Sequence, residues 1–323
     1  MFNIAVVIPA YNAARTIGRA LASVKAQTVQ PAEIIIVDDG STDETATVVA
    51  ELSVDLPIRF LRQSNGGAAA ARQTGSEAST AEYIAYLDAD DWWPADKLEQ
   101  LQNILAVEPV DFLIADLRRI HEDRPDETLP GNRINFPWAM EYLESLAEQP
   151  IPGWYKLGPT SAVELLLRGF PAFPPTFLVK RSALMKVGGW NRGIRYCEDF
   201  DLALRLCDRF GLSYLDRPMA IMGLHSGNDN PYAYIVRQMN GGVEVLKSHH
   251  KTALLQNKTR FAEAVSFKLC SLAYALKQHG DKAGSRERYR QAMFWPGKRV
   301  HAFLRWAILS LQSVAEYSKV TDF

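Results

Sequence analysis

Short apolar runs rich in β-branched residues alternate with stretches of helical periodicity through the first third of the chain. Between the first two runs, Ile17, Leu21 and Val24 recur at the spacing of one helix face. Strands that alternate with helices in this way lie side by side in a parallel sheet. We therefore predict an α/β fold, a Rossmann-like and mostly parallel sheet flanked by helices. The expected strands are 4–8, 33–37, 58–62 and 83–87.

The pattern changes after the first third. Residues 120–150 carry seven acidic residues and four prolines, which predicts an acidic and partly irregular insertion. A strand is expected at 176–179, and from about residue 232 the periodicity is helical throughout. We expect one domain over 1–230, made of halves at about 1–115 and 116–230, followed by a helical C-terminal region over 231–323.

Charge and cysteine content exclude several classes of protein. The 36 Lys and Arg residues are balanced by 37 Asp and Glu residues, whereas broad nucleic-acid binding needs a strongly cationic surface. We therefore expect no nucleic-acid partner. The three cysteines have neither paired nor metal-like spacing, which excludes a disulfide scaffold and favours a reducing, cytoplasmic location.

Neither a signal peptide nor a membrane span is expected. Met1 leads into the first apolar run without a basic segment or a cleavage site. The longest apolar stretch, 302–315, is interrupted by Arg305 and Gln312 and is shorter than the ~20 residues that cross a bilayer.

Polar residues follow three of the predicted strands, at 9–12, 38–41 and 88–91. The carboxyl ends of parallel strands meet at one edge of a sheet, where ligands bind. Asp88 and Asp90 form an Asp-x-Asp element that can hold a hard divalent cation together with diphosphate oxygens. The same residues also suit a solvated turn with a helix cap, so both interpretations stay open.

Three further residues have two interpretations each. Asp39 can accept the imide N–H of a uracil or a similar base edge, although Asp and Gly are also ordinary turn residues. Tyr11 can lie against a base or belong to the edge of the core. Arg72 lies among small residues and needs an anionic or planar partner, the alternative being a surface salt bridge.

Glu198 and Asp199 precede a helical pattern, and the helix dipole favours acidic residues at that position whatever their role. If the pair is catalytic, Asp199 is the general base that takes a proton from an acceptor hydroxyl. His225 follows a late strand, where it is either a cation ligand or a structural histidine.

In this order, the motifs closely resemble the family 2 inverting glycosyltransferases of the GT-A fold. The resemblance covers about residues 3–230 and rests on the segments 7–12, 36–43, 86–91, 188–191 and 198–202. It implies a nucleotide-sugar donor with UDP favoured, Mn²⁺ or Mg²⁺ as cofactor, and direct displacement with inversion. The half at 1–115 would bind the donor and the half at 116–230 the acceptor, a saccharide or lipid-linked saccharide in cell-surface polysaccharide assembly.

The resemblance also implies a role for each matching residue. Those expected around the nucleoside are Pro9, Ala10, Tyr11, Asp39 and Arg72. Asp90 would bind the cation directly, with Asp88 nearer the ribose and Asp91 and His225 as further ligands. Asp199 matches the family's base and Glu198 its companion, and Gly189 and Trp190 lie in the loop that meets the acceptor.

The alternative of a different class is a catalytically silent glycan-binding or scaffold protein on the same fold. A nucleotidyltransferase lacks support because no Gly-rich start with a downstream Lys is present, and a dehydrogenase because Gly-x-Gly-x-x-Gly is absent.

The C-terminal region suggests a membrane contact. Residues 282–305 carry seven basic residues against Glu287, interleaved with aromatic ones. Such a segment suits the anionic inner surface of a membrane, or else it is a helix packed on the core with a solvated basic face.

Overall fold

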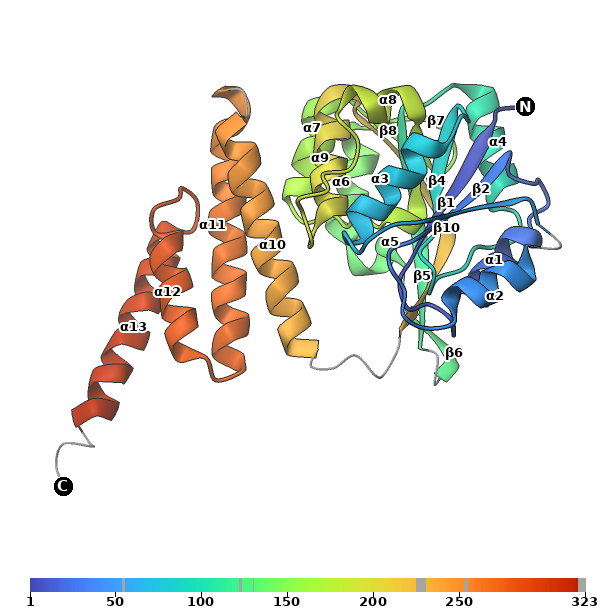
Figure 1. Cartoon of the computed structure of the whole chain (residues 1–323). Helices are drawn as coiled ribbons and strands as arrows, with labels where there is room; N and C mark the ends of the chain where they lie inside the picture. Colours follow the sequence, from blue (N-terminus) through green and yellow to red (C-terminus); the bar gives the residue numbers. More distant parts are fainter. Residues whose placement is uncertain (54–55, 122–123, 130, 225–230, 253–254, 319–323) are drawn as a thin grey trace. The chain divides into compact units, whose positions relative to one another are not determined.

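The computed structural model describes residues 1–53, 56–121, 124–129, 131–224, 231–252 and 255–318 (Figure 1). The chain forms two compact units, Met1–Gly227 and Asn228–Phe323. The first contains the sheet and the second is built from helices.

One sheet organises the first unit. Its strands lie in the order β3 (Ile58–Arg62), β2 (Glu33–Asp38), β1 (Ile4–Ala10), β4 (Tyr83–Tyr86), β9 (Phe177–Lys180), β5 (Phe112–His121), β10 (Leu212–Leu224), β8 (Trp154–Leu157) and β7 (Glu148–Ile151), with β6 (Arg124–Leu129) paired to β5. The first four strands are parallel, as is the pair β5 and β10. β9 runs antiparallel to both β4 and β5 and joins the two parallel parts. The predicted α/β fold is confirmed, with a mixed second half.

Helices cover both faces of the sheet because alternate residues of a strand point to opposite sides. Val6 and Ile8 of β1 belong to the core cluster that also contains residues of α1 (Ile17–Lys25) and α4 (Lys97–Val107). On the other face, Val7 contacts α3 (Ala68–Ala78) so closely that a Cβ on Gly75 would lie 2.5 Å from its Cγ1. The small residues of α3 thus allow the helix to approach the sheet.

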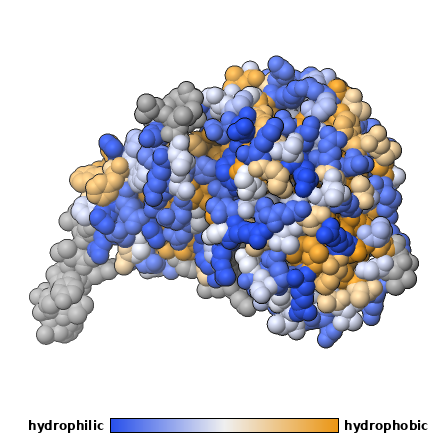
Figure 2. All heavy atoms as spheres, turned by 45° about the horizontal axis from the view of Figure 1, so that its top comes forward, coloured by the Kyte–Doolittle hydropathy of each residue, from blue (hydrophilic) through white to orange (hydrophobic). Residues whose placement is uncertain are grey.

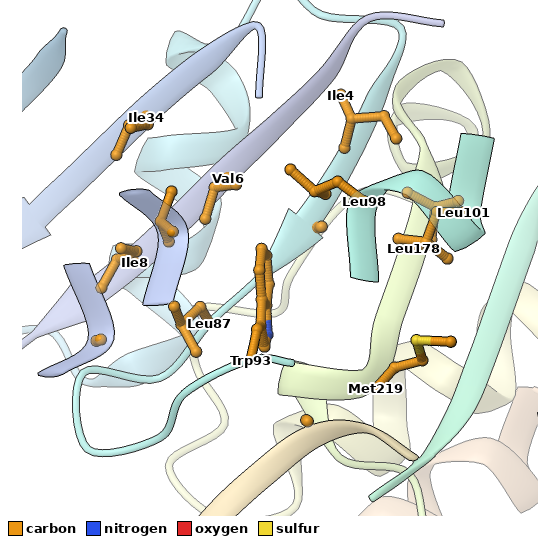
Figure 3. Packing of buried hydrophobic residues seen from close by; sticks show 14 of the residues in the cluster. Ile4, Val6, Ile8, Ile34, Leu87, Trp93, Leu98, Leu101, Leu178 and Met219 are labelled. Atoms are coloured by element: carbon orange, nitrogen blue, oxygen red, sulfur yellow. The ribbon is translucent and has the colours of Figure 1, made fainter. Parts of the chain in front are cut away.

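Trp93 marks the centre of this core (Figure 3). Its ring is 3% exposed and lies near Leu87, Leu98 and Met219. These residues come from the end of β4, from α4 and from β10, so the indole packs elements that are distant in sequence against one another. The core therefore fixes the segment that follows β4, which carries Asp88 and Asp90.

The expected acidic insertion is more regular than predicted. The chain from 120 to 150 contains the end of β5, β6, α5 (Asn132–Asn135), α6 (Pro137–Leu146) and the start of β7. Pro137 stands at the first position of α6, where its missing N–H and fixed φ favour a helix start. Charge and proline content therefore predicted a partly irregular segment, whereas Pro137 in fact begins a helix.

The remaining helices of the first unit are α2 (Thr45–Leu52), α7 (Pro159–Leu167), α8 (Arg181–Lys186) and α9 (Glu198–Phe210), with a 3₁₀ turn at Pro174–Thr176. The second unit contains α10 (Pro231–Thr252), α11 (Leu255–Gln278), α12 (Lys282–Ala292) and α13 (Arg299–Ser318). Within the described ranges, no helix combines the length and apolar composition needed to cross a membrane. Hydrophobic side chains form small areas among hydrophilic ones on the face shown in Figure 2.

Candidate active site

A pocket of about 610 Å³ opens where β1, β2 and β4 end. Pro9, Ala10 and Tyr11 line it from the end of β1, Asp39 from the end of β2, and the start of α3 closes one side. Asp88 and Asp90 follow β4 along the same wall, and Arg195 and Tyr196 come from the segment before α9. The residues that follow these three strands therefore line the same pocket, as the sequence predicts.

Hydrogen bonds join the ends of β1 and β2 and shape the first wall. The backbone N–H of Asp39 donates to the carbonyl of Ala10 at 2.8 Å. The backbone N–H of Asn12 donates to Ser41 Oγ at 2.9 Å, and Asn12 Oδ1 accepts from the backbone of Thr42 at 2.9 Å. These bonds hold Asn12 in a left-handed conformation with φ of 49°. The neighbouring Tyr11 ring stays 53% exposed at the pocket.

The carboxylate of Asp39 organises the second wall. Oδ1 accepts from Gln63 Nε2 at 2.7 Å and from the backbone N–H of Gly66 at 2.9 Å. Oδ2 accepts from the backbone N–H of Gly67 at 2.7 Å. Gly67 directly precedes α3 and has φ of 87°, a backbone conformation that favours glycine over residues with a Cβ. Asp39 therefore fixes the glycine turn and still borders the pocket.

Arg72 connects Asp88, at the pocket, to Glu198 at the start of α9. Its guanidinium donates to Asp88 Oδ1 at 2.6 Å and to Glu198 Oε1 at 2.9 Å, and lies 4.9 Å from the centre of the Trp190 ring. The side chain is 5% exposed, so the alternative of a surface salt bridge does not apply. Burial disfavours the charged form, but Asp88 and Glu198 raise the pKa of Arg72 above its ordinary value.

Asp199 lies in the first turn of α9, next to Glu198. Its Oδ1 accepts a hydrogen bond from the backbone N–H of Phe200 at 2.7 Å. Burial, and next the negative charge of Glu198, raise the pKa of Asp199 to about 7. Asp199 does not line the 610 Å³ pocket itself; the bridge from Glu198 through Arg72 to Asp88 links it to that pocket. A carboxyl that titrates near neutrality suits general-base chemistry.

Asp88 and Asp90 both border the pocket, and Asp91 does not. Asp91 is 3% exposed and accepts from the backbone of Gly223 at 3.3 Å. Burial, and next the charges of Asp88 and Asp90, raise its pKa to about 9. Asp91 is thus a buried acid outside the lining of this pocket, and its role as a further ligand stays a prediction.

The predicted cation has two candidate carboxylates. In the part of the chain that the structure describes, no group of three or more His, Cys, Asp or Glu side chains could hold a metal ion; His225, the third expected ligand, lies outside that part. Mg²⁺ and Mn²⁺ sites often use one or two carboxylates together with phosphate oxygens of the substrate. Asp88 and Asp90 therefore fit a cation that is completed by a diphosphate.

The loop before α9 is built around Gln73. Gln73 Oε1 accepts from the backbone N–H of Trp190 at 2.7 Å, and a Cβ on Gly189 would lie 2.2 Å from the same oxygen. Gly189 also has φ of 70°. Trp190 is 2% exposed and contacts the Tyr86 ring edge-on at 5.1 Å between ring centres. Trp190 packs against Arg72 inside the protein, and Gly189 packs against Gln73. A direct contact with an acceptor would require both residues to become exposed.

Sequence reasoning missed several residues of the site. Asn65, Arg195 and Tyr196 line the pocket, and Gln73 positions the loop. Arg195 and Tyr196 precede the Glu198-Asp199 pair with only Cys197 between them, and this position next to the acidic helix start was a usable signal. No comparable local signal marks Asn65 or Gln73.

Comparison with known proteins identifies the family. The model of the family described as "Glycosyl transferase family 2" matches residues 5–188. An uncharacterized glycosyltransferase of Nostoc sp., alr2836, is 37% identical over 178 residues, 53% of this chain and 54% of that protein. WfgD of Escherichia coli, named a UDP-Glc:alpha-D-GlcNAc-diphosphoundecaprenol beta-1,3-glucosyltransferase, is 34% identical over 123 residues, 38% of this chain and 48% of that protein. The chain thus spans about half the length of these relatives.

Solved structures share the fold. The mannosyltransferase PcManGT of Pyrobaculum calidifontis, in complex with GDP-Man and Mn²⁺, superimposes with a TM-score of 0.61 at 18% identity, over 96% of this chain and 81% of that one. S. aureus TarS 1-349 in complex with UDP-GlcNAc gives 0.57 at 14% identity, over 90% of both chains. The predicted resemblance and its GT-A type of fold are confirmed. The chain belongs to glycosyl transferase family 2.

Proposed function

We propose that this protein transfers a sugar from a nucleoside diphosphate sugar, with UDP favoured, to a hydroxyl of a saccharide or lipid-linked saccharide, with inversion at the anomeric carbon. The observation that carries this proposal is the continuity of the site. Asp39, Asp88 and Asp90 line one pocket, and Arg72 links Asp88 to Glu198, the neighbour of Asp199.

The donor's nucleoside would occupy the part of the pocket formed by the ends of β1 and β2. Tyr11 offers an exposed ring for stacking on a base. Asp39 is held rigidly by Gln63 and by the amides of Gly66 and Gly67, and a carboxylate oxygen has several acceptor positions. We assign the imide N–H of a uracil to the remaining acceptor capacity of Asp39. The names of WfgD and TarS, which mention UDP-Glc and UDP-GlcNAc, support UDP as the nucleotide.

Asp90 and Asp88 would hold Mn²⁺ or Mg²⁺ together with oxygens of the diphosphate. A divalent cation at this position supplies positive charge that stabilises the departing diphosphate. Arg72 binds one oxygen of Asp88. We assign the direct contact with the cation to Asp90, which borders the same pocket. The Mn²⁺ in the PcManGT complex supports a divalent cation in this fold.

Asp199 would act as the base. The acceptor oxygen attacks the anomeric carbon from the side opposite the diphosphate, the bond from that carbon to the diphosphate oxygen breaks, and the hydroxyl proton passes to the Asp199 carboxylate. Glu198 is held by Arg72, which keeps its charge beside Asp199 and raises the affinity of Asp199 for a proton. This direct displacement needs no covalent intermediate on the protein. A saccharide or lipid-linked saccharide as acceptor would give the protein a role in polysaccharide assembly.

Calorimetric titration with UDP-sugars and GDP-sugars, with and without Mn²⁺, tests the donor and the cation together. We expect Mn²⁺-dependent binding of UDP-sugars that Asp90→Ala abolishes. Glu51→Ala is the matched control, because it removes an exposed acid remote from the pocket lining. Normal binding by Asp90→Ala would refute the ligand assignment. Donor binding without hydrolysis or transfer would instead favour a catalytically silent glycan-binding protein.

A further inference from the structure

Helix α13 has apolar residues on two opposite faces. Ala302 and Leu309 are 0% and 4% exposed and form the face that packs within the second unit. Val300, Phe303, Leu304 and Ile308 are between 47% and 74% exposed. Their spacing of three or four residues places these four side chains on one stripe, away from the buried face. A helix with a second apolar stripe needs a partner for it.

A pocket of about 400 Å³ lies in the same unit and is lined by residues of α10, α11, α12 and the start of α13. Phe267 and Tyr274, two residues on α11, line it and are 54% and 55% exposed. Lys298, His301 and Arg305 contribute the charged or polar part of the wall. The pocket therefore combines aromatic surface with cationic groups, and none of the described residues that line it is acidic.

The cations at this pocket are available to an external anion. Within the described ranges, neither the Lys298 ammonium nor the Arg305 guanidinium forms an ion pair. On the α13 helix, His301 and Arg305 follow each other at a spacing of four residues and so border the exposed stripe along one side. The surface thus carries apolar groups and unpaired positive charge next to each other.

We propose that this surface, the α13 stripe of Val300, Phe303, Leu304 and Ile308 with the adjoining pocket, binds a bilayer that contains anionic phospholipid. The stripe enters the acyl boundary, and Lys298 and Arg305 contact lipid phosphates. Aromatic rings such as Phe303 and Tyr274 suit the interface between headgroups and acyl chains. This mode differs from the alternative of a solvated basic face, because the exposed face of α13 is apolar and the basic residues lie beside it.

Charge favours a membrane over a second copy of the chain. A symmetric pair of α13 stripes would bring the cations of both copies together, and like charges across an interface weaken association. An anionic lipid surface neutralises the same charges. The proposal is independent of the active site, since its residues all belong to the second unit and its test needs neither donor nor cation.

Flotation of the full chain with vesicles tests the proposal. We expect binding to vesicles of phosphatidylcholine with phosphatidylglycerol and little binding to phosphatidylcholine alone. Lys298→Glu/Arg305→Glu should lower the bound-to-free ratio roughly tenfold or more. Lys25→Glu/Lys186→Glu is the matched control, with the same change in net charge at exposed positions of the first unit. Phe303→Ser/Leu304→Ser should also release the protein, and circular dichroism and melting verify that each variant is folded.

Two results would overturn the proposal. One is equal flotation with neutral and anionic vesicles, or flotation that is unchanged by the Lys298 and Arg305 reversal. The other is a stable dimer in sedimentation velocity without vesicles that Phe303→Ser/Leu304→Ser dissociates, because the stripe would then be covered by a second copy. A monomer that floats only with anionic vesicles supports the proposal.

Discussion

Asp39 and Asp199 are residues of the same type on two sides of the proposed reaction, and their surroundings differ. Asp39 accepts hydrogen bonds from Gln63 and from the backbone N–H groups of Gly66 and Gly67. Asp199 accepts one from the backbone of Phe200, close to the negative charge of Glu198, and its pKa is raised to about 7. Hydrogen-bond donors surround the Asp39 carboxylate, whereas burial and the charge of Glu198 oppose the charged form of Asp199. A carboxylate that accepts several hydrogen bonds from the protein, such as Asp39, can shape the wall of a binding pocket. A carboxylate that accepts a hydrogen bond from one backbone N–H group and lies near another negative charge, such as Asp199, can take up a proton.

The largest expected effect comes from removing the proton acceptor. In Asp199→Asn the side chain keeps its shape and its acceptor for Phe200, but it cannot take the hydroxyl proton. We expect the transfer rate to fall roughly 10²–10⁴-fold while donor affinity is retained. The rate is measured as nucleotide release in the presence of acceptor, with donor affinity from calorimetry as the control. Unchanged turnover would exclude Asp199 as the base, and Asp199 would then have no role in the reaction that distinguishes it from Asp39.

Gly189→Ala tests how Gln73 holds the loop that precedes α9 and Asp199. Gly189→Ala would bring a Cβ to 2.2 Å from Gln73 Oε1 at φ of 70°, so it combines a clash with backbone strain. The strain alone costs about 1–2 kcal/mol, and displacement of Gln73 from the Trp190 amide adds to it. Gly188→Ala is a matched control because φ is 85° but no atom lies within 4 Å of the new Cβ. Chemical denaturation should show the larger loss for Gly189→Ala; equal losses would mean that Gln73 yields freely.

Asp39→Asn tests whether the Asp39 carboxylate holds the glycine turn before α3. The amide that replaces one carboxylate oxygen would point an N–H group at Gly66 or Gly67, or at Gln63, all of which donate. One unsatisfied donor costs about 1–3 kcal/mol, and we expect a loss of stability in that range together with weaker donor binding. Asp208→Asn, at an exposed position, should change the free energy of unfolding by less than about 0.5 kcal/mol. A fully stable Asp39→Asn would show that the carboxylate does not hold the glycine turn.

Parts of the site that depend on local pattern were predictable from sequence. Short apolar runs, rich in β-branched residues in β1 and β2, define β1, β2 and β4. The rule that ligands bind at the carboxyl ends of parallel strands placed Asp39, Asp88 and Asp90 together. The resemblance to the family then supplied roles that no single motif could establish.

Other features depend on contacts between distant segments. The partner of Arg72 on α9 lies 126 residues away, and no periodicity links the two. The insertion of β9 between β4 and β5 in antiparallel direction is likewise a pairing of distant strands. The resemblance places Trp190 in the loop that meets the acceptor, but the packing of Tyr86 and Arg72 around it encloses the ring. Local sequence could not show which side chains of the loop face inward.

The smallest predicted effect concerns pH and separates the roles of Glu198 and Asp199. Because the pKa of Asp199 is raised to about 7, its base form is lost as the pH falls below that value, and the transfer rate should drop about tenfold per pH unit there and level off above it. Glu198→Gln removes a neighbouring negative charge that raises this pKa, so the acid limb should move to lower pH. Rates from pH 5 to 9 for both proteins measure the shift. A limb that stays in place in Glu198→Gln would mean that the pKa of Asp199 is raised without Glu198, by burial and by the charge of Asp88, and that Arg72 holds Glu198 for structural reasons.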